Sequence, residues 1–355
     1  MRSKSKFSPH DPNHVFIIAE AGSNWKAGTY RQDLKRAKQL IDIASKCGAD
    51  AIKFQMFRAD TVYVLNAGDS DYLKKSGIRK NINEIFQRSE MPYEMLPQLH
   101  DYCKKRRIEF MVTPFSVKDA QTINKFVRIH KVASYEINHI RLLEYLATTK
   151  KPIILSTGAS NYEEIDFSIN LLKKYRVKEY ALLQCTARYP ASLDSLNLSV
   201  IPQMRNRYKI PIGLSDHSTD PVIGPLVAMS LGATIIEKHF TLDRRLAGPD
   251  HRFALIPSEL KKMVQSVRDA QKAFGDGKKQ VLKVEKELRD FAVRRIQATR
   301  NIKRGEKFVE GINIGVLRPG RKTKGADARF LPKIIGSTSK RSINLGEGIR
   351  LQDCA

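Results

Sequence analysis

The chain has 355 residues, of which 41% are hydrophobic, and its 63 lysines and arginines against 37 acidic residues give a formal net charge of +26. A chain of this length predicts one large domain and a small second one. No apolar run approaches the roughly 18 residues that cross a bilayer, and the run at 15–19 is too short for a signal peptide. We therefore expect a cytoplasmic protein that makes no contact with a membrane.

The positive charge is spread along the whole chain and is not confined to a tail. A nucleic-acid-binding protein would show a basic stripe with interleaved aromatic residues or a known reader motif, and the sequence has neither. The charge fits better with a solvated basic surface that attracts anionic substrates. Four widely spaced cysteines indicate a reduced cytoplasmic enzyme and argue against a disulfide framework or a zinc module.

In chain order, eight short apolar runs predict buried β-strands. They are 15–20, 51–55, 109–113, 129–133, 152–156, 180–184, 211–215 and 234–238. Segments with helical spacing follow most of them, at 30–47, 96–107, 118–126, 142–148, 162–174, 221–231 and 258–274. The polar stretch 60–90 is expected to be a long loop insertion on the functional face of the fold.

Eight strand–helix units in about 250 residues predict an α/β fold, a (β/α)8 TIM barrel, over residues 1–274. A doubly wound open sheet is the alternative, but no G-x-G-x-x-G motif follows the first strand. In both folds the carboxyl ends of the strands form the functional edge. Polar residues gather at these ends: Glu20, Lys53, Gln55, Thr113, Lys131, Ser134, Glu136, Ser156, Thr186, Ser215, His217, Lys238 and His239.

Two neighbouring strand ends carry a histidine, in Gly-Leu-Ser-Asp-His217 and in Ile-Ile-Glu-Lys-His239. Two neutral imidazoles can hold a divalent metal and leave other positions open for water and substrate. Asp216 and Glu237 could each orient one of the rings. Either histidine alone could be an ordinary polar residue, whereas the pair favours a metal site.

Lys53 falls within a predicted buried strand. A buried ammonium group is costly unless it has a partner. An anionic ligand would explain the lysine, and a structural salt bridge is the alternative.

The composition changes after Gly275, where residues 275–297 predict a linker and 298–355 a small, mostly β module. This module contains a weak repeat, Ile302-Lys-Arg-Gly-Glu306 against Ile343-Asn-Leu-Gly-Glu347, and a rigid Arg318-Pro-Gly turn. So small a module is expected to have a poor core of its own and to gain stability by docking, for example onto a partner subunit.

The chain resembles the sialic acid synthase family, with its C-terminal antifreeze-like (SAF) domain, over nearly its whole length from residue 15. The motifs that carry the resemblance are FIIAEAGSN (16–24), GADAIKFQ (48–55), KPIILSTG (151–158), Cys185-Thr with Tyr189-Pro190, GLSDH (213–217), EKHF (237–240) and GPDH (248–251). These motifs in this order are highly specific. The repeat and the Arg-Pro-Gly segment resemble the SAF domain.

The resemblance implies a metal-dependent synthase that condenses phosphoenolpyruvate with a 2-acetamido hexose, such as N-acetylmannosamine, and releases phosphate. It implies Mn2+ or Mg2+ on His217 and His239, polarising the sugar aldehyde and placing a water. Glu20 and Glu136 are the implied carboxylates for proton transfer or for holding sugar hydroxyls. The implied phosphoenolpyruvate ligands are Lys53, Thr113, Lys131, Ser134, Ser156 and Ser215, and the implied sugar ligands are Gln55, Tyr189, Asp250 and Arg318. Arg318 is implied to act across a domain-swapped homodimer.

Three residues depart from the family pattern: Trp25 replaces a frequent histidine, Ala187 a common Ser or Asn, and Ala254 a common serine. These changes bear on the sugar accepted and on efficiency. Two rival functions stay open. A metal-dependent aldolase using pyruvate would need fewer phosphate-binding groups, and a non-catalytic sugar-binding relative would bind phosphoenolpyruvate without turnover.

Overall fold

The structure is a computed structural model that describes residues 14–69 and 80–355. The chain divides into two compact units, Met1–Gly275 and Asp276–Ala355. The first unit contains an eight-stranded parallel sheet, and the second contains a two-stranded antiparallel sheet.

The eight predicted strands all form, within one or two residues of the expected ends. They are β1 (Phe16–Gly22), β2 (Ala51–Met56), β3 (Glu109–Pro114), β4 (His130–Val132), β5 (Ile153–Ser156), β6 (Tyr180–Cys185), β7 (Ile212–Asp216) and β8 (Ile235–His239). The sheet order is β3-β2-β1-β8-β7-β6-β5-β4, and β3 contacts β4 to close the ring. The fold is therefore the predicted (β/α)8 barrel, and the open doubly wound sheet is excluded.

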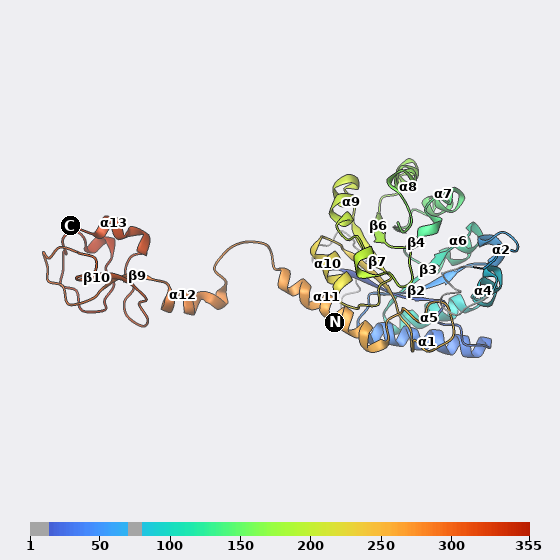
Figure 1. Ribbon diagram of the computed structural model, residues 1–355, viewed down its shortest axis with the longest axis horizontal. Coiled ribbons are helices and arrows are strands. Elements are labelled where there is room, and N and C mark those ends of the chain that lie inside the picture. Colours follow the sequence, from blue (N-terminus) through green and yellow to red (C-terminus); the bar gives the residue numbers. More distant parts are fainter. Residues whose placement is uncertain (1–13, 70–79) are drawn as a thin grey trace. The chain divides into compact units, whose positions relative to one another are not determined.

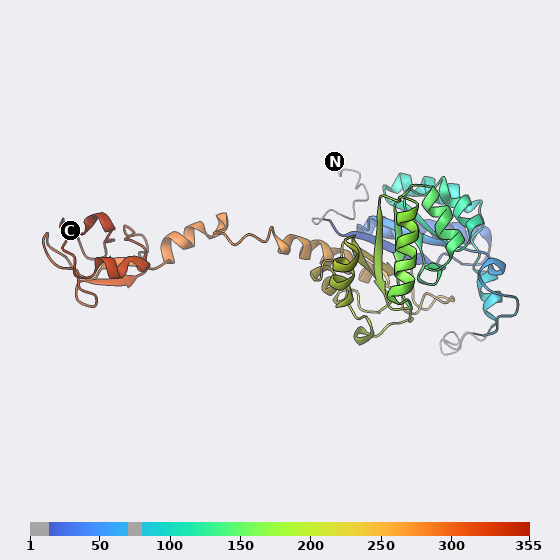
Figure 2. The ribbon, with the colours of Figure 1, turned by 90° about the horizontal axis from the view of Figure 1, so that it is seen from above.

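Helices cover the outside of the strands, as Figures 1 and 2 show. They are α1 (Tyr30–Cys47), α5 (Met95–Arg106), α6 (Val117–Asn124), α7 (Ile140–Thr148), α8 (Tyr162–Lys174), α9 (Val200–Tyr208), α10 (Ile223–Ser230) and α11 (Pro257–Phe274). The sequence did not predict α9, because it buries only Ile201 and Met204 and so shows little helical spacing. Gly48 ends α1 at φ 86°, as its place behind the last apolar residue predicted.

The stretch 60–90, expected to be a loop, contains two short helices in its described parts. They are α2 (Ala59–Val62) and α4 (Ile82–Arg88). Ile82 and Ile85 of α4 form a small buried cluster with Phe86 packed against it. The part of this prediction that falls on residues 70–79 lies outside the described residues.

The barrel interior changes character along the strands. At its lower end the inward side chains form one apolar cluster of Phe16, Ile18, Ala51, Met111, Ile129, Ile154, Ala181, Leu183 and Ile235. Because side chains alternate between faces, the residue two positions further along each strand points into the same interior. Those residues are mostly polar or charged and buried: Glu20, Lys53, Thr113, Lys131, Ser156, Ser215 and Glu237. The predicted functional edge is thus the upper part of the barrel interior.

The second unit opens with a one-turn helix and α12 (Lys286–Ala292), and then pairs β9 (Arg295–Ala298) with β10 (Ile314–Leu317). Short helical turns include α13 (Leu331–Ile334), so the unit is less regular than an all-β module. The expected poor core is also wrong, because one fully buried cluster joins Ile296, Ala298, Ile302, Phe308, Ile314, Ile334, Ile343 and Ile349. Most of these are single β-branched residues scattered along irregular chain, which is why periodicity did not reveal the core.

The two copies of the sequence repeat are partners in the fold. Ile302 and Ile343 exchange both backbone hydrogen bonds, at 2.8 and 2.9 Å. In each copy the glutamate accepts a backbone N–H three residues earlier, Glu306 from Lys303 at 3.0 Å and Glu347 from Asn344 at 2.8 Å. The repeat therefore encodes two equivalent turns that pair about a local pseudo-twofold axis.

Candidate active site

Lys53 joins three neighbouring strands at the upper end of the barrel interior. Its Nζ lies 2.7 Å from Glu20 Oε2 on β1 and donates to Thr113 Oγ1 on β3 at 3.0 Å. Gln55, two residues further along β2, donates from Nε2 to Glu20 Oε1 at 3.0 Å. The ammonium group is therefore held by a charged and a neutral oxygen from opposite sides.

Lys131 occupies the equivalent place on β4. Its Nζ donates to Ser156 Oγ at 2.6 Å and to the carbonyl oxygen of Val132 at 2.9 Å. Glu237 lies between the two lysines, with Oε1 3.7 Å from the Nζ of Lys53 and 3.8 Å from the Nζ of Lys131. The same oxygen accepts from Ser215 Oγ at 3.2 Å. Two lysines, two carboxylates and three hydroxyls thus line one water-poor chamber.

Burial shifts the pKa values of several groups within this chamber, and it lowers the pKa of Lys131. Burial raises the pKa of Glu20 to about 7, although Lys53 acts in the opposite direction. Burial also raises the pKa of Glu237, but Lys131 and Lys53 outweigh this effect and the net shift is downward. Around neutrality Glu237 is therefore ionised while Glu20 is partly protonated, and the two lysines face between one and two negative charges.

His217 and His239 point into the same chamber from β7 and β8, with ring centroids 5.5 Å apart. The Nδ1 of His217 lies 2.9 Å from the carbonyl oxygen of Thr186, so Nδ1 carries the hydrogen and the electron pair of Nε2 is available. For His239, Nδ1 is buried and has no hydrogen-bond partner among the described residues. Burial, followed by the neighbouring His217, holds the pKa of His239 well below its usual value, which keeps the ring neutral.

Neither acidic neighbour orients a histidine ring, contrary to the expectation from the sequence. Asp216 faces away from the chamber and forms an ion pair with Lys238, at 2.6 Å between Oδ2 and Nζ. Glu237 turns to the two lysines and to Ser215. Strand alternation accounts for Asp216, which points to the face opposite His217. Glu237 shares a face with His239, but its carboxylate is turned to the lysines and Ser215.

Two aromatic rings wall off the histidine pair. The ring of Tyr189 lies 4.1 Å from that of His217, centroid to centroid, at an interplanar angle of 33°. Phe253 lies 5.0 Å from His239 and 5.2 Å from Tyr189. The imidazole rings therefore contact aromatic side chains on one side and face the charged chamber on the other.

Asp250 reaches the same edge from the loop after β8. Its Oδ2 accepts from both the backbone N–H and the hydroxyl of Ser23, at 3.1 and 2.9 Å. Gly22 permits this approach, because a Cβ there would lie 2.7 Å from Asp250 Oδ2 and 3.4 Å from the His239 ring, at a φ of 51°. Because Gly22 has no side chain, Asp250 and His239 can both lie close to its backbone.

Ser134 and Glu136 follow β4 in a single helical turn, Ser134–Glu136. Ser134 Oγ accepts the backbone N–H of Gly158 at 3.0 Å, which ties this turn to the end of β5. Burial raises the pKa of Glu136 to about 7, so its carboxyl can give or take a proton near neutral pH.

The structure brings most of the predicted barrel residues together at one end of the interior, whereas Lys238 lies on the outer face of β8. Arg318 belongs to the second unit and follows β10 there. Sequence reasoning gave Glu237 a different role, that of orienting a histidine ring, and missed Phe253. The place of Glu237 in the chamber could have been found from the two-residue period that links it to His239 and Ile235. Phe253 lies outside any strand, and nothing in its local sequence indicated its contact with the histidines.

The donors in the chamber fit a divalent cation only as a partial ligand set. The two imidazole rings lie with their centroids 5.5 Å apart, and the buried Nδ1 of His239 has no hydrogen-bond partner among the described residues. Within 14–69 and 80–355, no group of three or more His, Cys, Asp or Glu side chains is arranged to hold a metal ion. A cation here would therefore complete its coordination with water and substrate, as an open catalytic site requires.

Comparisons with known proteins identify both units of the chain. The NeuB family model matches residues 40–279 and the SAF domain model matches residues 293–354. The chain is 39% identical to the spore coat polysaccharide biosynthesis protein SpsE of Bacillus subtilis, over 96% of this chain and 93% of that protein. It is 36% identical to the N,N'-diacetyllegionaminic acid synthase of Campylobacter jejuni, over 95% and 99% of the two chains.

Among solved structures, the N-acetylneuraminic acid synthetase of Leptospira borgpetersenii, in complex with citrate, matches with a TM-score of 0.68 and 35% identity. This match covers 78% of the present chain and 90% of the other. The fold and the C-terminal unit together define a (β/α)8 barrel protein with an SAF domain. The chain belongs to the NeuB family, whose relatives found here include synthases of legionaminic, pseudaminic and N-acetylneuraminic acids.

Proposed function

We propose that this chain condenses phosphoenolpyruvate with a 2-acetamido sugar to form a nonulosonic acid and inorganic phosphate. The observation that carries the proposal is the chamber in which Lys53 and Lys131 lie on one side and His217 and His239 on the other. The lysines and hydroxyls suit a substrate with a phosphate and a carboxylate. The histidines suit the carbonyl end of an open-chain sugar.

In this reaction C3 of phosphoenolpyruvate forms a bond to the aldehyde carbon of the sugar, and the aldehyde oxygen takes up a proton. A water then attacks C2 and loses its protons, and phosphate leaves with the C2–O bonding pair. A divalent cation on His217 and His239, Mn2+ or Mg2+, would polarise the aldehyde. Glu136, with a pKa near 7, is the carboxyl we assign to proton transfer at the sugar, and Glu20 the second such group.

Sugar recognition is assigned to the residues around the histidines. Gln55, Tyr189 and Asp250 lie at this end of the chamber and offer an amide, a phenol and a carboxylate for hydroxyl and acetamido groups. The names of the relatives support a 2-acetamido or diacetamido sugar as substrate. Phosphate release, measured against a panel of N-acetylmannosamine, its 6-phosphate and diacetamido-dideoxy sugars, tests both the reaction and the acceptor.

The same assay separates the rival functions. A metal-dependent aldolase would consume pyruvate and release no phosphate, and a sugar-binding relative would bind phosphoenolpyruvate without turnover. The two buried lysines favour the synthase, because their ammonium groups suit the phosphate and carboxylate of phosphoenolpyruvate, whereas an aldolase has no phosphate to bind.

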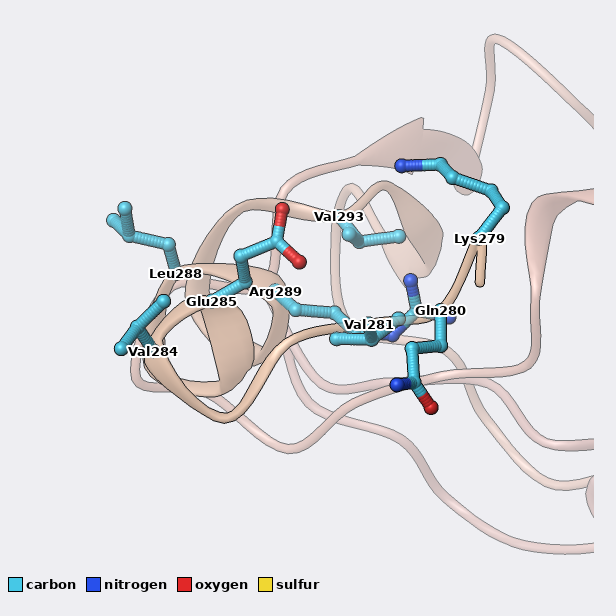
Figure 3. A pocket seen from close by; sticks show the side chains of 8 residues that line it. All are labelled: Lys279, Gln280, Val281, Val284, Glu285, Leu288, Arg289 and Val293. Carbon is cyan, nitrogen blue, oxygen red and sulfur yellow. The ribbon is translucent and has the colours of Figure 1, made fainter. Parts of the chain in front are cut away.

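We further propose a domain-swapped homodimer that acts in the cytoplasm. The start of the second unit, drawn in Figure 3, exposes large apolar side chains: Val281 by 49%, Val284 by 85% and Leu288 by 64%. An apolar stripe of this kind is suited to a protein partner. A second copy of the chain is the occupant we assign, with Arg318 of the exposed turn after β10 reaching the partner's sugar. The free cysteines fit a reducing compartment, and no described helix has the length and apolarity of a membrane span.

A further inference from the structure

A second ion pair lies behind the histidines, on the outer face of β7 and β8. Lys238 Nζ is 2.6 Å from Asp216 Oδ2, and the two side chains are 2% and 0% exposed. Asp216 and Lys238 are register partners of adjacent strands. Each directly precedes a histidine of the chamber, so the ion pair and the histidine pair lie on opposite faces of the same two strand ends.

Lys238 and Asp216 also bond to Ser218, the residue that follows His217. Lys238 Nζ also donates to the carbonyl oxygen of Ser218 at 2.7 Å and to its hydroxyl at 3.2 Å. The other oxygen of Asp216, Oδ1, accepts the backbone N–H of Ser218 at 2.7 Å. The residues before and after His217 are therefore both fixed to Lys238, which belongs to the strand that carries His239.

The space behind the histidines could be filled without burying two charged side chains. Replacing a buried ion pair by apolar residues of similar volume is often neutral or stabilising. The surrounding fold is nevertheless adapted to the pair, because a Cβ on Gly224 of α10 would lie 2.6 Å from Asp216 Oδ2. The charges thus supply directed hydrogen bonds to the 216–218 turn that an apolar pair of the same size would lack.

We propose that Asp216 and Lys238 are positioning residues that set the spacing of His217 and His239 for a divalent cation. The inference rests on the proposed function, since it assumes that the two imidazoles bind the metal. Groups that orient metal ligands typically change metal affinity by about 10- to 100-fold when they are removed. The pair acts through backbone placement and touches neither metal nor substrate.

The test compares Mn2+ affinity by electron paramagnetic resonance in the full-length chain and in four variants. Lys238→Met and the double variant Asp216→Leu/Lys238→Met remove the directed bonds, and the double variant keeps a filled, uncharged contact. Lys151→Met is the matched control, because Lys151 is a part-buried lysine that also bonds carbonyl groups, including that of Val127 at 2.9 Å, away from the chamber. His217→Ala tests the metal site itself.

We expect both Lys238 variants to bind Mn2+ about tenfold or more weakly, with activity partly restored by excess Mn2+ and the KM for phosphoenolpyruvate little changed. Lys151→Met should keep the wild-type affinity. If the folded double variant binds Mn2+ as tightly as the wild type, the positioning role is overturned. If His217→Ala also retains Mn2+, the two-histidine site of the proposed function fails instead, and the two failures are distinguishable. Should Lys238→Met not fold, the double variant and Asp216→Asn carry the same test.

Discussion

Lys53 and Glu20 form a 2.7 Å ion pair across β1 and β2, and both side chains are almost completely buried. The pair is part of a larger arrangement in which Glu237 Oε1 lies 3.7 Å from Lys53 Nζ and 3.8 Å from Lys131 Nζ. At these separations the ammonium groups are not closely paired with Glu237 and can turn to a stronger anion. This geometry supports the proposed binding of an anionic substrate between the two lysines.

The proposed function predicts that phosphoenolpyruvate affinity depends on both lysines. Lys53→Met and Lys131→Met keep the aliphatic stem and remove the charge, and each should weaken phosphoenolpyruvate binding by about 1.5–3 kcal/mol, roughly 10- to 100-fold. Sugar affinity should change much less. Isothermal titration calorimetry with each ligand measures both, and Lys46→Met, in the last turn of α1, is the control. Unchanged phosphoenolpyruvate affinity in both variants would show that the lysines serve the fold alone.

The raised pKa of Glu20 predicts a pH dependence with a definite sign. Below about pH 7 Glu20 is protonated and Lys53 is free to pair with an anion. As the pH rises through 7 Glu20 ionises and competes for Lys53, so phosphoenolpyruvate binding should weaken between pH 6 and 8.5. In Glu20→Gln this loss should disappear, and the ionisation of the substrate phosphate, with a pKa of about 6, is common to both proteins. Parallel pH profiles of the dissociation constant would contradict the assignment.

The histidine pair predicts metal dependence. His217→Ala or His239→Ala should abolish turnover and metal binding, because a cation cannot be retained by one imidazole among so few donors. The barrel should stay folded, since the rings lie at the open end of the interior and not in its apolar cluster. Circular dichroism checks the fold and phosphate release checks turnover. Full activity after exhaustive chelation would refute this prediction.

The proposed dimer predicts complementation between two inactive variants. Arg318→Ala removes the arginine of the SAF unit, and His217→Ala removes the barrel site. In a mixed dimer one active site combines an intact barrel with an intact partner arginine, so mixing should restore up to about a quarter of the activity for statistical exchange. Subunit exchange is established first by co-purification of differently tagged chains. Mixed dimers without activity would mean that Arg318 acts within its own chain or has no part in the reaction.

The core of the SAF unit predicts that a substitution within it lowers the stability of this unit without affecting the barrel. Phe308 is fully buried in the cluster of the second unit. Phe308→Ala should destabilise this unit by about 3–5 kcal/mol, since it removes a buried ring and leaves a cavity. Hydrogen exchange resolved by segment should show faster exchange across 295–355 and little change in β1–β8. Uniformly faster exchange in both units would show that they unfold together.

The sequence alone was sufficient for the barrel and for most of the chamber. Local apolar runs predict strands, and period-two alternation places Lys53, Lys131 and Ser215 on one face, because both signals depend on only a few neighbouring residues. The family motifs added residues that no period could select, such as Tyr189 and Asp250. Local patterns did not reveal α9, because this helix is weakly amphipathic. They also did not reveal the core of the second unit, because its residues are distant in sequence.

Only the tertiary structure decided which charged groups meet. Asp216 stands one residue before His217, and Glu237 stands two residues before His239. Asp216 pairs with Lys238 outside the barrel, while Glu237 lies between Lys53 and Lys131 inside it. The difference is one step of strand alternation combined with the closure of the sheet, which brings β2, β4 and β8 around one interior. A side chain's partner across a closed barrel depends on strand order and register, and these are properties of the whole fold.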